Sequence, residues 1–249
     1  MSDLVEYALR LGDDALVLAQ RLGEWSSRAP ELEEDVALTN IGLDLLGQAR
    51  GLLSYAGEVE AAGRGEDELA YLREEPEFRN CLLVEQPNGD FAVTIARQLF
   101  FSTYQLGLYR ELAGSVDPTL AAVAGKAVKE VDYHVDHAAG WTVRLGDGTE
   151  ESHARMQGAI EALWPYTGEL FQGDDAVGRL AAAGVAVDPA TLRPSWERAL
   201  DAVLAEATLT RPEQGWQHTG GRRGVHTEHM GYLLAEMQYL HRLHPGARW

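Results

Sequence analysis

The sequence has little cysteine, no long apolar run and few basic residues. Cys81 is the only cysteine among 249 residues, so an intrachain disulfide cannot form, as is usual for proteins of a reducing compartment. No apolar run approaches the roughly 18–20 residues that a membrane span needs. The first residues carry acids where a secretory signal peptide would carry bases. Together these absences predict a soluble, cytoplasmic protein.

The shortage of basic residues restricts the choice of partner. Lys and Arg number 21 against 39 Asp and Glu, which gives a formal net charge of −18 at pH 7. Nucleic acids and anionic membrane surfaces both attract basic proteins, so neither is an expected partner. The acidity suits a basic protein partner, although a high net charge also favours solubility by itself.

Helical periodicity dominates what the sequence does contain. Hydrophobic residues make up 45% and charged residues 24%, which is normal for a globular protein with a full core. Apolar residues recur at helical spacing, and this pattern predicts seven helices. They are expected at residues 3–25, 31–60, 90–113, 119–145, 149–164, 195–209 and 227–243. Glycines and prolines interrupt residues 61–90, which predicts a long irregular connection.

The order of these segments predicts the fold class. Two long helical hairpins joined by one long crossover are typical of the ferritin-like topology. We find no strand pairs and no internal repeat in the sequence. We therefore expect an all-α protein, a ferritin-like four-helix bundle with a long crossover and additional C-terminal helices. Residues 1–249 are expected to form a single domain.

Ferritin-like bundles often hold two irons, so the sequence can be searched for the ligands. The usual set is one Glu from each of two helices and a Glu-x-x-His pair from each of the other two. In the first hairpin, Asp13 or Asp14 lies as far from the turn as Asp44, so these acids could meet inside the bundle. However, Gly47 stands where a histidine would follow Asp44, and the first histidine of the chain is His134. The first hairpin therefore supplies no imidazole.

The second hairpin offers only part of a ligand set. Three candidate ligands lie on one face of the helix expected at 119–145, namely Glu130, His134 and His137. The facing helix has no Asp or Glu from residue 91 to residue 110, and the neutral Gln98 and Ser102 stand level with the candidates. Two elements of the usual set are therefore missing, and we expect no metal in this chain.

The four di-iron-like positions are better interpreted as the vestige of a site. Asp44, Glu130, His134 and His137 are expected to form a buried hydrogen-bonded network, because buried polar groups need such partners. Lys126 lies one turn before Glu130 and could contribute to it. No catalytic or cofactor-binding residue is expected in the chain.

A second group of histidines, at residues 226–229, reads His-Thr-Glu-His. The spacing is not the HExxH of zinc proteases. We expect a helix start instead, with Thr227 as N-cap and Glu228 near the positive end of the helix dipole. His226 and His229 are then expected on the surface or at an interface.

Arg222 and Arg223 form a small basic island in an acidic chain. The surrounding glycines do not form a P-loop, because the GK[ST] ending is absent. The island could contact CoA phosphates on a neighbouring subunit or an acidic partner, but the sequence favours a plain flexible loop. Trp249 could dock into the body of the protein or into a partner, and the sequence does not choose between these.

The remaining aromatic and thiol side chains have ordinary expected roles. Phe100, Phe101 and Tyr104 are expected in the core or at a subunit interface, and not in a substrate pocket. Cys81 lies in the irregular connection with no histidine nearby in sequence, so we expect no nucleophilic role.

Three stretches, residues 32–50, 129–157 and 226–249, resemble the C subunits of the bacterial phenylacetyl-CoA oxygenase (ring 1,2-epoxidase) complexes. The resemblance runs in order over nearly the whole chain and is most specific in the segment Arg-Leu-Gly-Asp-Gly-Thr-Glu-Glu-Ser and in the tail. It implies a ferritin-like fold and partnership with a homologous A subunit. In that family the A subunit holds the di-iron centre and epoxidises the ring of phenylacetyl-CoA with dioxygen, and a reductase subunit supplies electrons. The C subunit is the structural partner without a working metal site.

Three hypotheses follow. The leading one is a non-catalytic structural subunit that stabilises and assembles the A subunit, contacts other subunits of the complex and could also self-associate. The second is an autonomous di-iron oxidase or ferroxidase with unconventional ligands from Asp44, Glu130, His134 and His137. The third is a module that binds a CoA ligand through Arg222 and Arg223.

Overall fold

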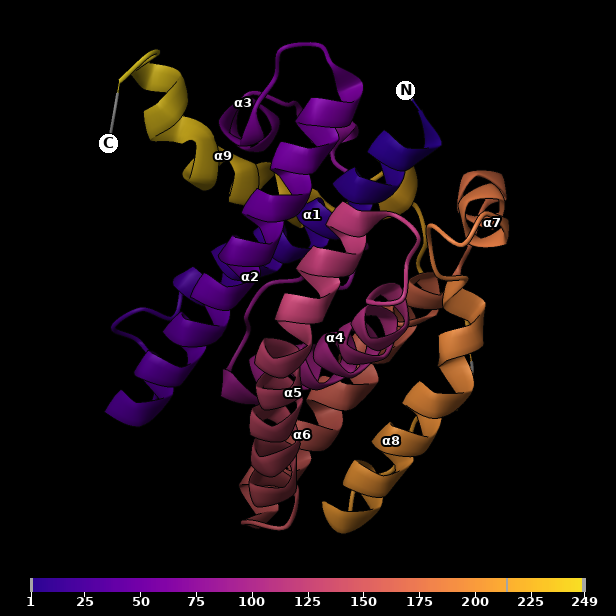
Figure 1. Ribbon diagram of the computed structural model, residues 1–249. Helices are drawn as coiled ribbons and strands as arrows, with labels where there is room; N and C mark the ends of the chain where they lie inside the picture. Colours follow the sequence, from indigo (N-terminus) through magenta and orange to yellow (C-terminus); the bar gives the residue numbers. More distant parts are fainter. Residues whose placement is uncertain (1, 214, 248–249) are drawn as a thin grey trace. The chain divides into compact units, whose positions relative to one another are not determined.

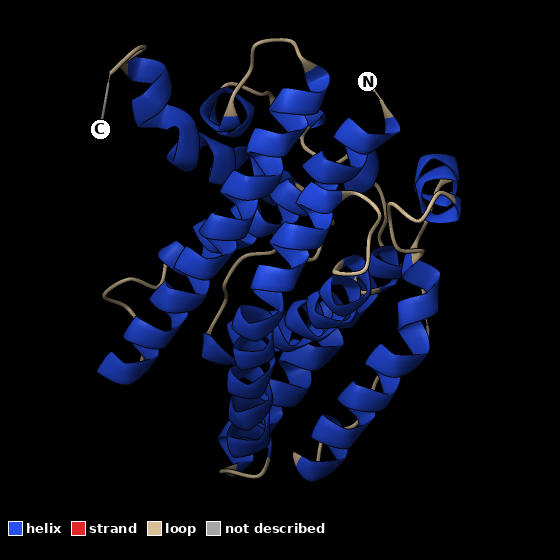
Figure 2. Ribbon diagram, in the orientation of Figure 1, coloured by secondary structure: helices blue, strands red, loops and turns tan. Residues whose placement is uncertain are grey.

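The structure is a computed structural model that describes residues 2–213 and 215–247, and all regular structure in this part of the chain is helical (Figure 2). The chain divides into two compact units. Unit 1 comprises Met1–Pro87 and Gly220–Trp249, and unit 2 comprises Asn88–Thr219. Each unit is compact in itself, and their union in a single domain stays a prediction.

Unit 1 is built on a pair of long helices (Figure 1). Its elements are α1 (Asp3–Gly23), α2 (Leu32–Glu60), α3 (Glu66–Tyr71), η1 (Glu75–Glu77), η5 (Gly221–Arg223) and α9 (Glu228–Leu243). Every residue of α1 from position 7 to position 18 is buried. The helix can approach α2 closely because Gly12 has no side chain: a Cβ there would lie 2.9 Å from Leu53 Cδ2. The burial of this central part of α1 on all sides agrees with its apolar residues on more than one face.

Unit 2 is a second helical hairpin with additional helices around it. Its longer helices are α4 (Phe91–Leu112), α5 (Pro118–Gly146), α6 (Glu150–Leu163), α7 (Asp175–Ala182) and α8 (Arg193–Glu206). Short 3-10 turns precede α7 and α8, namely η2 (Trp164–Tyr166), η3 (Gly168–Phe171) and η4 (Pro189–Leu192). Thr149 caps α6 as expected, because its hydroxyl accepts a hydrogen bond from the Ser152 amide at 3.1 Å.

The centre of unit 2 is aromatic. Phe100 of α4 packs against Trp164 and Trp196, with ring centroids 5.8 and 6.0 Å away. The indole N–H of Trp196 donates to the Phe100 carbonyl oxygen at 2.9 Å, so this large side chain is buried with its polar atom satisfied. Phe101 and Tyr104 are also buried, which confirms that the aromatic residues of this helix belong to the core.

All seven predicted helices are present, with ends within three residues of those expected. Two short helices were missed. α3 lies inside the stretch that was expected to be irregular, and α7 has only eight residues, which is too short to show a clear periodic pattern. Within the described residues, no helix is both long and apolar enough to cross a membrane.

Candidate functional site

The di-iron-like residues of unit 2 lie together on α5. Glu130, His134 and His137 follow one another along the helix, with His134 fully buried and the other two partly buried. The Lys126 ammonium is 3.9 Å from a Glu130 carboxylate oxygen, on the exposed side of the helix. Asp44 belongs to α2 of unit 1. A network that joins Asp44 to the α5 residues stays a prediction.

The α4 side of this site does not provide anionic ligands. Gln98 and Ser102 are buried, and neither side chain carries a charge. The Ser102 hydroxyl donates to the Gln98 carbonyl oxygen at 2.6 Å, so it serves the backbone of its own helix. A di-iron centre of this kind needs a carboxylate from each of the four helices, because the carboxylates neutralise and bridge the metals.

On α1, the first of the two candidate acids is already bound to a cation of its own unit. Asp13 is fully buried and forms a bidentate ion pair with the buried Arg73, whose Nη1 is 3.0 Å from Asp13 Oδ2. The same oxygen accepts a hydrogen bond from the Arg79 amide at 2.8 Å. Arg73 also lies over the Phe78 ring, 4.1 Å from its centroid. Asp13 therefore faces the crossover segment.

Asp14, the second candidate acid, is also bound within its own unit, by an arginine and a backbone amide. Its Oδ1 accepts a hydrogen bond from the Cys81 amide at 2.7 Å, and its Oδ2 pairs with Arg222 Nη2 at 2.8 Å. Burial raises the pKa of the Asp14 carboxyl above its ordinary value, and the facing Arg222 guanidinium offsets this only in part. The ionised carboxylate thus depends on its partners to remain buried.

The pairing with Asp14 corrects the interpretation of the basic island. The Arg222 guanidinium also donates to the carbonyl oxygens of Arg10 and Arg79, at 3.2 and 3.0 Å. The expectation of a flexible loop is wrong here, and Arg222 is not available for a CoA phosphate. Arg223 is exposed, and its contact with a substrate or partner stays a prediction. Trp249 lies outside the described residues.

Two glycines allow this C-terminal loop to lie directly on the crossover. A Cβ at Gly221 would be 2.2 Å from the Asn80 carbonyl oxygen, and one at Gly224 would be 2.1 Å from the Pro76 oxygen. Gly224 also has a φ of +74°, a left-handed conformation that favours glycine. The glycines of the basic island therefore serve close backbone packing.

His226 completes the contact between the C-terminal segment and the crossover. Its Nδ1 is 2.7 Å from Glu85 Oε2 and its Nε2 is 3.2 Å from the Phe78 carbonyl oxygen. Burial lowers the pKa of His226, but the hydrogen bond and negative charge of Glu85 outweigh it, so the pKa lies above its ordinary value. Since both ring nitrogens face acceptors, the doubly protonated imidazolium satisfies both.

The expectation that His226 lies on the surface or at an interface is therefore wrong, because its side chain is fully buried against Glu85 of the same chain. Thr227 stands at the N-cap position of α9 as expected, although its side chain makes no capping bond. Its amide donates to Glu85 Oε1 at 2.6 Å instead. Glu85 thus binds both residues that lead into the helix.

We call Asp13, Asp14, Arg73, Glu85, Arg222 and His226 the buried ionic cluster. It connects α1, the crossover and the C-terminal segment of unit 1, which are far apart in sequence. Sequence reasoning missed Arg73, Glu85 and the partners of Asp14, because ion pairs between residues 60 or more positions apart leave no periodic signal. The paired acids Asp13 and Asp14 inside an apolar stripe were the available hint.

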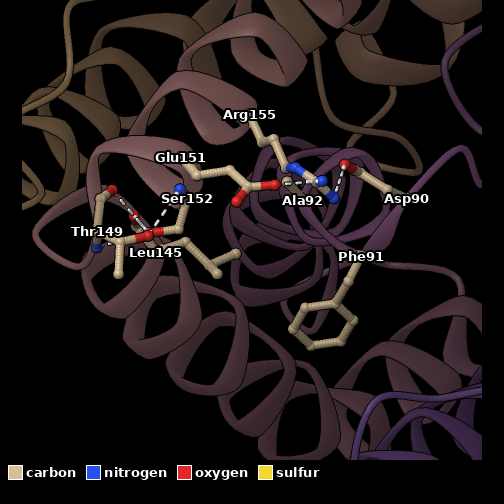
Figure 3. A pocket seen from close by; sticks show the side chains of 8 residues that line it. All are labelled: Asp90, Phe91, Ala92, Leu145, Thr149, Glu151, Ser152 and Arg155. Carbon is tan, nitrogen blue, oxygen red and sulfur yellow. Dashed lines mark hydrogen bonds and ion pairs between the residues drawn. The ribbon is translucent and has the colours of Figure 1, made fainter.

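A small pocket of unit 2 lies where α4 begins and α5 meets α6 (Figure 3). Its volume is about 270 Å³, below the range of most ligand sites. Arg155 lies between Glu151 and Asp90, and Figure 3 shows both pairs as dashed lines. The guanidinium is thus already neutralised, and the pocket has no free charge for a phosphate group.

The donors of the described residues do not fit a metal centre. Across residues 2–213 and 215–247, no group of three or more His, Cys, Asp or Glu side chains is arranged to hold a metal ion. The acids of α1 are bound to arginines, and the α4 residues expected level with Glu130 and His134, Gln98 and Ser102, are neutral. That the protein carries no metal stays a prediction, to be tested by iron content.

These features define an all-α protein of the ferritin-like class, as the sequence predicted. The family model described as "Phenylacetic acid catabolic protein" matches residues 1–249, so the chain belongs to this family. It is 55% identical over 250 residues to the C subunit of the 1,2-phenylacetyl-CoA epoxidase of Escherichia coli (strain K12), and the match covers 100% of each chain. The resemblance expected from the three sequence stretches is confirmed.

Proposed function

We infer that this chain is the non-catalytic structural subunit of a multicomponent oxygenase that epoxidises the ring of phenylacetyl-CoA in aerobic phenylacetate degradation. The observation that carries this inference is the full-length match, at 55% identity, to the C subunit of such an epoxidase. In this scheme a homologous A subunit holds the di-iron centre and the substrate. The present chain stabilises and assembles that subunit, and it carries no cofactor itself.

The internal design of the chain supports a structural role. The acids of α1 that could have served as iron ligands instead hold the crossover and the C-terminal segment in place. Carboxylates that are buried and paired with arginine cannot also ligate a metal without breaking those pairs. The chemistry of these residues therefore favours a rigid partner over a catalyst.

The proposal places the protein in the cytoplasm as one component of a hetero-oligomer. Its partners are the catalytic A subunit and the other subunits of the complex. The net charge of −18 supports protein partners rather than nucleic acid or an anionic membrane.

Co-expression tests the structural role. The A subunit is produced with and without this chain, and its soluble yield and epoxidation of phenylacetyl-CoA are measured with dioxygen and the reductase present. We expect both yield and turnover to require the chain. A Val116→Ser variant, changed at an exposed side chain, should support the A subunit as well as the wild type does. An A subunit that is soluble and fully active alone would overturn the proposal.

Iron content separates this proposal from an autonomous di-iron oxidase. The purified chain is loaded anaerobically with Fe(II) and desalted, and we expect almost no retained iron. About two irons per chain, as in a di-iron bundle, would favour the oxidase if Glu130→Ala removed them. Asp136→Ala, at an exposed acid of the same helix, is the matched control and should leave the iron content unchanged.

A further inference from the structure

The outer face of α9 carries an unusual number of exposed apolar side chains. Tyr232, Tyr239, Leu240 and Leu243 expose 77%, 61%, 57% and 53% of their surfaces. The spacing of seven and four residues places Tyr232, Tyr239 and Leu243 on one face of the helix. Its inner face is buried through Met230, Leu233, Leu234 and Gln238. The helix is therefore apolar on both faces, although unit 1 uses only one of them.

A groove of about 500 Å³ runs beside this face. It is lined by Glu74, Glu75, Gly231, Leu234, Ala235, Gln238, Tyr239, Arg242 and Leu243. Gly231 and Ala235 keep the groove open, since a Cβ at Gly231 would already lie 3.0 Å from Glu75 Oε2. The groove spans residues 231–243 of α9, which is a length of about 18 Å at 1.5 Å per residue. This length accommodates about three turns of a partner helix.

The walls of the groove are held in place by hydrogen bonds. The Arg242 guanidinium donates to the carbonyl oxygens of Tyr71 and Arg73, both at 3.0 Å, and pairs with Glu74 at 2.9 Å. The Gln238 amide donates to the carbonyl oxygens of Ala70 and Arg73, both at 3.1 Å. A binding surface that is already ordered loses less conformational entropy when a partner docks.

The charge of the groove indicates the chemistry of the partner. Arg242 pairs with Glu74 and donates to two carbonyl oxygens. Glu75 forms no ion pair within the described residues, and its charge acts on the His226 imidazole without direct contact. Glu228 and Glu236 of α9 add further negative charge to the exposed side of the helix. A second copy of this chain would bring the same acidic rim and a net charge of −18, so like charges would oppose self-association.

We propose that the groove and the tyrosine face of α9 dock a helix of the catalytic subunit that is apolar along one side and carries Lys or Arg beside it. This proposal rests on the proposed function and adds the surface through which it acts. Exposed tyrosines that flank a groove are typical anchors of protein interfaces. The partner's cation faces Glu75, and its apolar side chains fill the space beside Gly231 and Ala235.

Dilution of the co-expressed complex measures the contribution of this surface. The tagged catalytic subunit is purified with the wild-type chain or with Tyr232→Glu/Tyr239→Glu, and dissociation is followed by size exclusion over a dilution series. We expect the double variant to dissociate at a concentration at least about 30-fold higher, the change that corresponds to loss of one interface hot spot. Val116→Glu, at an exposed apolar residue of unit 2, is the matched control and should dissociate like the wild type.

The charge of Glu75 gives a second, independent measurement. We expect the wild-type complex to weaken as salt rises, and Glu75→Gln to reduce that salt dependence while the circular dichroism spectrum of the variant stays that of the wild type. This variant tests the surface even if the double tyrosine variant fails to fold.

The outcomes distinguish the surface from the function. If the wild-type chain forms no complex, the proposed function fails. If the complex forms and both variants dissociate as the control does, the surface is wrong and the function stands. If light scattering shows that the chain alone is a dimer which Tyr232→Glu/Tyr239→Glu disrupts, the face serves a second copy and the proposal is overturned.

Discussion

The two units differ in the side chains that fill their interiors. Unit 1 encloses buried ion pairs, such as Asp13 with Arg73 and Asp14 with Arg222. Unit 2 is centred on aromatic rings that pack around Phe100 and Trp196. The difference follows from the backbone that each unit has to bury. Irregular segments leave amide groups without helical partners, whereas long helices satisfy their own.

In unit 1, buried carboxylates accept hydrogen bonds from amides of the irregular segments. The amides of Arg79 and Cys81 donate to Asp13 and Asp14, and the amide of Thr227 donates to Glu85. Each carboxylate replaces the carbonyl oxygen that regular structure would have supplied. The arginines then neutralise the buried charges. Buried acids in a helical protein can therefore indicate an irregular segment that must be held, as well as a metal site.

The largest expected effect comes from breaking one ion pair of unit 1. Asp13→Ala leaves the buried Arg73 guanidinium without its carboxylate, and we expect the free energy of unfolding to fall by about 4 kcal/mol. Urea unfolding followed by circular dichroism measures this. Glu33→Ala, at an exposed acid of α2, is the control and should stay within about 0.5 kcal/mol of the wild type. A loss as small as that of the control would mean that the ion pair does not hold the crossover.

A smaller loss of stability is expected when one indole of the aromatic centre of unit 2 is replaced by a smaller ring. Trp196→Phe removes the hydrogen bond to the Phe100 carbonyl oxygen and leaves a small void, so we expect a loss of about 2 kcal/mol. The same urea titration measures it. Trp216→Phe changes an exposed indole and should have little effect. Equal losses in the two variants would contradict an aromatic centre at Trp196.

The pH dependence of stability measures the contribution of His226, which we expect to be smaller than that of Trp196. Its folded pKa lies above the ordinary value of 6.5 because Glu85 outweighs burial, so the imidazolium stabilises the folded state. This contribution is complete below pH 6.5 and is lost as pH rises through the higher folded pKa. We expect thermal melts of the wild type to show this fall, and His226→Gln and Glu85→Gln to lack it. A variant with the wild-type slope would exclude the pair as its source.

The smallest effect should come from the neutral polar groups of unit 2. Among the described residues, Gln98 Oε1 is buried and accepts no hydrogen bond. Gln98→Leu should therefore be neutral or stabilise by up to about 1 kcal/mol. Gln238→Leu in unit 1 is the matched comparison, and it should cost about 1 kcal/mol because its amide donates to two carbonyl oxygens. A large loss of stability in Gln98→Leu would mean that the Gln98 side chain has a hydrogen-bond partner in the folded protein.

The helices could be predicted from the sequence because their signals are local. The apolar period of 3.6 residues and caps such as Thr149 give the type and the limits of each long helix. α3 was missed because its six residues are too few to show a period. The search for di-iron ligands on the two hairpins also used local information, because it depends only on which residues stand at given distances along the sequence from each turn.

The sequence alone thus determined the helical class, the family resemblance and the missing ligands, since all of these depend on residue identity and short spacing. Only the tertiary structure decided where the buried charges go. Arg222 was expected in a flexible loop and His226 on the surface or at an interface. Instead, the partly buried Arg222 and the buried His226 side chain pair with acids more than 140 residues away. The physical reason is that a buried charge is stable only beside a partner that the folded chain brings to it, and such pairs follow no sequence period.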